Sequence, residues 1–63
     1  MNQYAILKYF EYQHLPERLQ KISKPFYDLA HSMAEGESNS SLETAAGLRK
    51  LLEAKDCAVR AAL

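Results

Sequence analysis

The chain has 63 residues, and its eight basic and eight acidic side chains give a net charge of zero. A chain of this length buries only about 60% of the surface that its unfolded form exposes, so small domains usually depend on disulfides, metal ions or self-association. One cysteine excludes an internal disulfide, the two histidines and the cysteine lack metal-ligand spacing, and the absence of a basic excess disfavours DNA binding. Self-association is the remaining way to stabilise so short a chain, and the sequence therefore predicts a homo-oligomer.

No apolar run is long enough to span a membrane, and no segment resembles a signal peptide. We therefore expect a cytoplasmic protein without a membrane partner, in a reducing compartment. The pattern predicts one domain, residues 1–63, in the all-α class. Its expected parts are an N-terminal arm 1–14, a first helix 15–35, a linker 36–41 and a second helix 42–63.

Residues 1–12 are rich in aromatic and β-branched side chains, which favour a short strand or an extended arm. A single strand has no partner within this chain. We therefore expect an arm that lies across a helix or across a neighbouring subunit.

The first helix is predicted from Leu15-Pro16-Glu17, because proline suits a first turn and an acidic residue complements the helix dipole there. Apolar residues then recur at a helical spacing: Leu15, Leu19, Ile22, Phe26, Leu29 and Met33. Pro25 interrupts the backbone hydrogen bonds within this stripe. Either one helix continues with a kink, or the helix stops near Ser23 and restarts. The unbroken stripe favours one kinked helix.

The linker is short and polar, so the two helices are expected to be antiparallel neighbours in a helical hairpin. The second helix is made of strong helix formers, with a leucine stripe at 48, 51 and 52. Its opposite side carries small residues and one lysine: Ala46, Lys50, Ala54, Cys57 and Ala61. That side is unusually apolar for a solvated surface, so the hairpins are predicted to pack into a closed symmetric oligomer with the second helix at its centre.

Four residues are candidates for binding an anionic, aromatic ligand. Lys55 lies within the leucine stripe, where it either extends its ammonium to solvent from a packed stem or meets a ligand at a subunit junction. Arg60 is either a partner of Asp56 and of the helix dipole or one of several converging phosphate ligands in a symmetric assembly. Tyr12 either stacks on a base or covers the core. Lys24 either reaches a phosphate or is solvated.

Catalysis is not expected, because the chain has no nucleophile motif and no glycine-rich phosphate loop. Carboxylates such as Glu53 and Asp56 are better explained by surface ion pairing. We expect a protein that is not an enzyme and that has no cofactor and no metal.

The segment Tyr-Gln-His-Leu-Pro-Glu at 12–17, the hairpin that follows it, and the ending Ala-Val-Arg-Ala-Ala at 58–62 resemble a family of small phage proteins. These helical-hairpin proteins counter the bacterial CBASS and Thoeris defence systems by sequestering cyclic oligonucleotide or cyclic ADP-ribose signals without cleaving them. The resemblance covers most of residues 10–63. It implies a hexamer that binds cyclic dinucleotides near Tyr12 and a lysine of the first helix, for which Lys24 is the nearest match, and cyclic trinucleotides near Arg60. Pro25 departs from the family pattern.

The first functional hypothesis is therefore a phage immune-evasion sponge for cyclic nucleotide signals. The second is a small helical module or inhibitor that docks a host protein through an apolar helical face. The third is a small transcriptional regulator, which the zero net charge disfavours.

Overall fold

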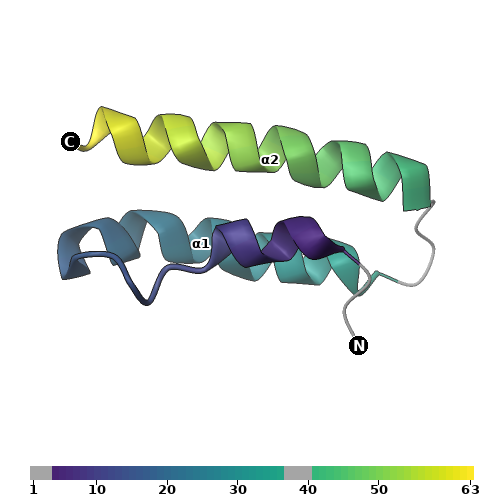
Figure 1. The fold of residues 1–63 in the computed structure, drawn as a ribbon, viewed down its shortest axis with the longest axis horizontal. Helices are drawn as coiled ribbons and strands as arrows, with labels where there is room; N and C mark the ends of the chain where they lie inside the picture. The colour runs from purple at the N-terminus through teal and green to yellow at the C-terminus, as the bar shows by residue number, and fades with distance from the viewer. Residues whose placement is uncertain (1–3, 37–40) are drawn as a thin grey trace.

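The fold is all-α, as the sequence predicts. A computed structural model describes residues 4–36 and 41–63, which contain three elements: a 3-10 helix η1 (Ala5–Phe10) and two α-helices, α1 (Glu17–Ala34) and α2 (Ser41–Ala61). Figure 1 shows α1 and α2 side by side and antiparallel. The described part of the chain has no strand. Residues 1–3 of the expected arm and 37–40 of the expected linker lie outside the described residues.

Helix α1 starts and continues as the local sequence predicts. Pro16 is its N-cap residue and Glu17 occupies its first turn. The helix runs through Pro25 without stopping, so the interpretation as one continuous helix is confirmed, while the size of any bend there stays a prediction. At its end, the Gly36 N–H donates to the Met33 carbonyl at 3.3 Å, which closes the last turn in 3-10 fashion.

Helix α2 buries its leucine stripe as expected. Leu48 is fully buried, and Leu51 and Leu52 pack around it against the core. Gly47 lies at a close approach of the two helices, because a Cβ atom there would be 3.1 Å from the terminal methyl carbon of Met33.

The buried face of α1 differs from the expected apolar stripe. Its buried residues are Leu19, Ser23 and Ala30, whereas Leu29, which belongs to the expected stripe, is 50% exposed. The reason is that α1 packs against two neighbours, α2 and η1. Small side chains lie at the centre of the face that these neighbours cover, and the larger apolar side chains flank it. The periodicity located the helix and most of its covered side correctly, since Leu19 is buried and Phe26 and Met33 pack against the core, but it placed Leu29 wrongly and missed the buried Ser23 and Ala30.

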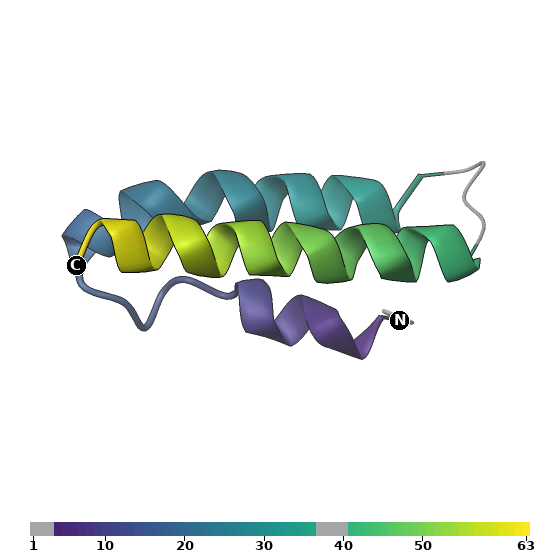
Figure 2. The ribbon, with the colours of Figure 1, turned by 90° about the horizontal axis from the view of Figure 1, so that it is seen from above.

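The N-terminal segment is helical, so the prediction of a strand or an extended arm is wrong. In η1, Leu7 and Phe10 are three residues apart and therefore share one face of a 3-10 helix, and both are buried. Figures 1 and 2 together show η1 running alongside α1 and α2, and it contacts both. Its contact with the helices of the same chain agrees with the packing expected for this segment.

The core lies where the three elements meet. Its buried cluster consists of Leu7, Phe10, Ala30 and Leu48, with Phe10 the largest fully buried side chain. Partly buried side chains surround it: Tyr4, Ile6, Phe26, Tyr27, Met33, Ala34, Leu51 and Leu52. Within residues 4–36 and 41–63, no helix is long and apolar enough to cross a membrane.

Ser23 provides a test of this packing. Its side chain is fully buried in α1 and its Oγ has no hydrogen-bond partner. Burying an unpaired hydroxyl costs about 1–3 kcal/mol in proteins, and alanine is also the better helix former. We expect Ser23→Ala to stabilise the fold by about 1 kcal/mol, which raises Tm by about 4–8 °C in a chain of this size. Thermal unfolding followed by circular dichroism measures this, and the exposed substitution Ser32→Ala is the matched control. A lower Tm for Ser23→Ala would show that the hydroxyl has a partner.

Candidate functional site

Two of the four candidate residues, Tyr12 in the segment before α1 and Lys24 on α1, lie in one aromatic neighbourhood. The Tyr12 ring meets Tyr27 edge-on, with centroids 5.2 Å apart and an interplanar angle of 73°. Tyr27 in turn packs against His31, with centroids 4.3 Å apart and an angle of 43°. We call Tyr12, Tyr27 and His31 the aromatic row. Tyr27 and His31 are four residues apart on α1 and therefore share one face of the helix.

The segment between η1 and α1 positions Tyr12. The Gln20 side-chain amide in the first turns of α1 donates to the Leu15 carbonyl at 2.8 Å and to the Gln13 carbonyl at 3.4 Å. The Leu15 N–H also donates to the Tyr12 carbonyl at 3.0 Å. These contacts tie the segment to the start of α1, so the Tyr12 ring is presented to Tyr27.

Lys24 carries the positive charge beside the aromatic row. Its Nζ lies 2.9 Å from Asp28 Oδ2, one turn further along α1, and both side chains are more than half exposed. The hydrogen bond that Lys24 donates to Asp28 raises the pKa of Lys24 above its usual value, the charge of Asp28 raises it further, and Tyr12 and Tyr27 make smaller contributions in the same direction. Lys24 is therefore fully charged at neutral pH. Because the pair is exposed, solvent screens it and Asp28 can be displaced by another anion.

Lys55 and Arg60, the other two candidates, lie on α2. The Lys55 side chain is only 13% exposed even in a single copy of the chain. Its Nζ lies 3.5 Å from Asp56 Oδ1. The guanidinium of Arg60 is exposed and donates to Cys57 Sγ at 3.6 Å. The expected pairing of Asp56 with Arg60 is therefore wrong, since Asp56 pairs with Lys55. Among the contacts of the described residues, none joins Lys55 or Arg60 to Tyr12 or Lys24.

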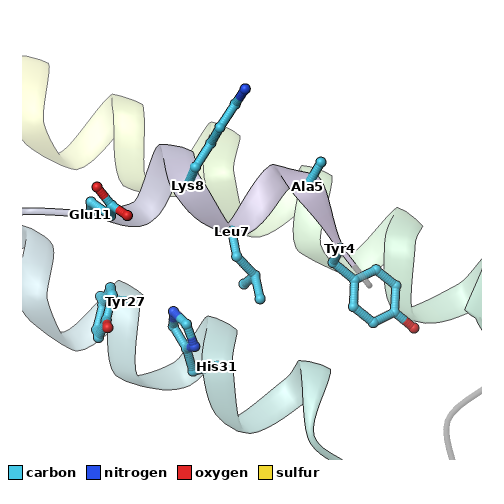
Figure 3. A pocket seen from close by; sticks show the side chains of 7 residues that line it. All are labelled: Tyr4, Ala5, Leu7, Lys8, Glu11, Tyr27 and His31. Atoms are coloured by element: carbon cyan, nitrogen blue, oxygen red, sulfur yellow. The ribbon is translucent and has the colours of Figure 1, made fainter. Parts of the chain in front are cut away.

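Sequence reasoning missed a pocket that the structure shows between η1 and α1. Its volume is about 320 Å³, and Figure 3 shows the seven side chains that line it: Tyr4, Ala5, Leu7, Lys8, Glu11, Tyr27 and His31. In that view His31 projects from α1 toward η1, Leu7 projects from η1 toward α1, and Tyr27 lies beside His31 on α1. A helical N-terminus would have revealed this, because residues 4, 7, 8 and 11 then follow one side of the segment. The strand interpretation separated them.

The arrangement offers binding groups. Three aromatic rings follow one another beside an exposed ammonium, and two of them, Tyr27 and His31, also line the pocket. Aromatic faces bind flat heterocycles, and ammonium groups bind phosphate. Within the residues that the structure describes, no three His, Cys, Asp or Glu side chains form a group that could hold a metal ion.

Comparisons with known proteins add no assignment: no family model, no curated protein and no solved structure matches this chain.

Lys55 can be tested as a structural residue separately from any ligand. Its stem occupies a position in the leucine stripe of α2, and replacing a mostly buried charge by an apolar side chain of similar size is often neutral or stabilising. We expect Lys55→Leu to raise the free energy of unfolding by about 1 kcal/mol, and Lys55→Ala to lower it because the stem no longer covers the core. Urea denaturation of the two variants measures both changes. Destabilisation by Lys55→Leu would show that the Asp56 pair stabilises the fold.

Proposed function

We propose that this chain is a non-catalytic binding protein that sequesters a cyclic oligonucleotide or a cyclic ADP-ribose type signal. The observation that carries the proposal is that Tyr12 and Lys24 lie in one neighbourhood around Tyr27, although they are distant in the sequence. By the resemblance to the phage anti-CBASS and anti-Thoeris hairpins, Tyr12 matches the tyrosine that binds cyclic dinucleotides, and Lys24 is the nearest match to the lysine that does so. Immune evasion by a phage in its host's cytoplasm is the biological role that this proposal implies.

The chemistry of the neighbourhood supports such a ligand. Stacking of a base on an aromatic side chain contributes about 1–3 kcal/mol to binding and tolerates different bases. A compact ligand with two or three phosphates needs a few nearby cations, so a chain with zero net charge can bind it. Lys24 is charged, exposed and held by one exchangeable carboxylate, which suits a phosphate contact.

Self-association into a symmetric homo-oligomer, a hexamer by the resemblance, is part of the proposal. The buried apolar core of one copy contains only five residues among those described: Leu7, Phe10, Leu19, Ala30 and Leu48. Leu42 and Leu63 are 84% and 79% exposed, and the small-residue side of α2 is exposed at Ala46, Ala54, Cys57 and Ala61. A second copy packed on α2 would cover this surface and bring Arg60 toward a shared site.

A second function, docking of a host protein, is favoured by a different observation. Tyr9 and Leu29 are each at least half exposed although they are large and apolar, and neither belongs to the small-residue side of α2. Exposed side chains of this kind can anchor a partner helix or loop. This alternative predicts no affinity for cyclic nucleotides.

The first prediction concerns binding by the two clustered residues. We expect Tyr12→Ala and Lys24→Met to weaken the binding of a cyclic dinucleotide about tenfold or more, because they remove a stacking surface and a charged hydrogen-bond donor. Isothermal titration calorimetry on the purified chain measures the affinities, and light scattering on the same sample gives the subunit count. Lys21→Met, on the same helix and also exposed, is the matched control. Unchanged affinity in both variants contradicts the site, and failure of the parent to bind any cyclic di- or trinucleotide or cyclic ADP-ribose isomer contradicts the function.

A second prediction concerns a substitution that should strengthen binding instead of weakening it. In the unbound protein the Asp28 carboxylate pairs with the Lys24 ammonium, so a ligand phosphate must compete with that carboxylate for the ammonium. We expect Asp28→Asn to strengthen binding of the same ligand severalfold, because it removes a competing and repelling carboxylate. Calorimetry at low and at physiological salt measures the effect, which should shrink as salt screens the charges. Weaker binding by Asp28→Asn would show that the pair orients Lys24 productively.

A further inference from the structure

The pocket between η1 and α1 contains none of the four residues that the sequence nominated, and its lining defines its chemistry. Tyr27 and His31 form its wall on α1, and Leu7 of η1 lines it together with Tyr4, the residue before η1. Glu11, the residue that follows η1, adds a carboxylate. Aromatic and apolar walls of this kind accept a flat ring. A volume of about 320 Å³ is at the small end of the range for ligand pockets, so it suits a single base.

The two charged residues of the lining differ in orientation. The Lys8 ammonium lies 5.2 Å from the centre of the Tyr9 ring, and Figure 3 shows its side chain extending from η1 away from α1. The carboxylate of Glu11 lies at the end of η1 near Tyr27 in the same lining. An ionised carboxylate only accepts hydrogen bonds, and its two oxygens bind best to two adjacent donors. The pocket therefore offers a stacking wall together with a paired acceptor.

We propose that this pocket is a base subsite that selects guanine. The Watson–Crick edge of guanine presents two neighbouring N–H donors, at N1 and N2, which match the two oxygens of Glu11 while the ring packs on Tyr27 and His31. Adenine presents one amino donor beside an unprotonated ring nitrogen, and that nitrogen repels the second carboxylate oxygen. The proposal deepens the proposed function and rests on it, because it assigns one part of the same nucleotide ligand.

The position of Tyr27 joins this subsite to Lys24. Lys24, Tyr27 and His31 occur at intervals of three and four residues on one face of α1, and Tyr27 contacts both Tyr12 and His31. Seven residues of α-helix rise about 10 Å, so a phosphate at Lys24 and a base beside His31 are separated by about that distance. One nucleotide ligand can therefore contact the cation and the pocket together.

The test compares two probes on the full chain, cyclic di-GMP and cyclic di-AMP, by calorimetry. We expect the parent to bind cyclic di-GMP about tenfold more tightly, and Glu11→Gln to remove that preference because an amide replaces one acceptor oxygen by a donor. Glu11 is exposed and its backbone N–H, which caps η1, is unchanged in the variant, so the fold should persist. Glu53→Gln, an exposed change on α2, is the matched control and should leave the ratio unaltered.

The possible outcomes test the guanine subsite separately from the proposed sequestering function. Loss of the guanine preference in Glu11→Gln alone supports the subsite. Binding of both probes with equal affinity by the parent, or an unchanged ratio in Glu11→Gln, overturns the subsite and leaves the sponge function standing. Failure of the parent to bind either probe, together with every other cyclic nucleotide, overturns both proposals.

Discussion

The burial of Phe10 is the interaction on which the rest of this structure depends. Two helices of this length share one seam, and the small side chains at the centre of α1, Ser23 and Ala30, leave it little apolar volume of its own. The 3-10 turn of η1 supplies Phe10 and Leu7, which pack with Ala30 and Leu48 into one cluster. A side chain of this size contributes several kcal/mol when it is fully buried, a large part of the stability of so small a domain. The chain thus has a three-element core, although its sequence suggests only a hairpin.

The candidate site follows from the same arrangement. Because η1 lies over α1, the two elements share an interface. Side chains along the part of this interface that is not closely packed line the pocket. The segment that leaves η1 must then cross to the start of α1, and this crossing presents Tyr12 to Tyr27. Binding groups therefore come from the covering element and from the helix it covers. The small-residue side of α2 remains exposed in this arrangement.

How far the sequence predicts this molecule depends on the element. The second helix and its leucine stripe were predictable, because strong helix formers and regular spacing agree there. The first helix was predictable through Pro25, and so was most of its covered side. The exposure of Leu29 and the burial of Ser23 and Ala30 were not, since periodicity weighs a leucine above small residues while packing against two neighbours favours the small ones. Residues 5–10 were not predictable as a 3-10 helix, because aromatic and β-branched composition equally suits a strand. The grouping of Tyr12 with Lys24 was inferred from a resemblance, whereas the pocket lined by Glu11 and His31 could be identified only once the position of η1 was known.

One residue, Tyr27, belongs to two environments at once. Its ring is the edge-on partner of Tyr12 and also part of the wall that His31 continues into the pocket. A group that shifts this ring from one side alters the surface presented on the other. Thermodynamic linkage requires such an influence to be reciprocal, with the same coupling free energy whichever side is occupied first. Any coupling that this ring transmits between the two sides would therefore act equally in both directions.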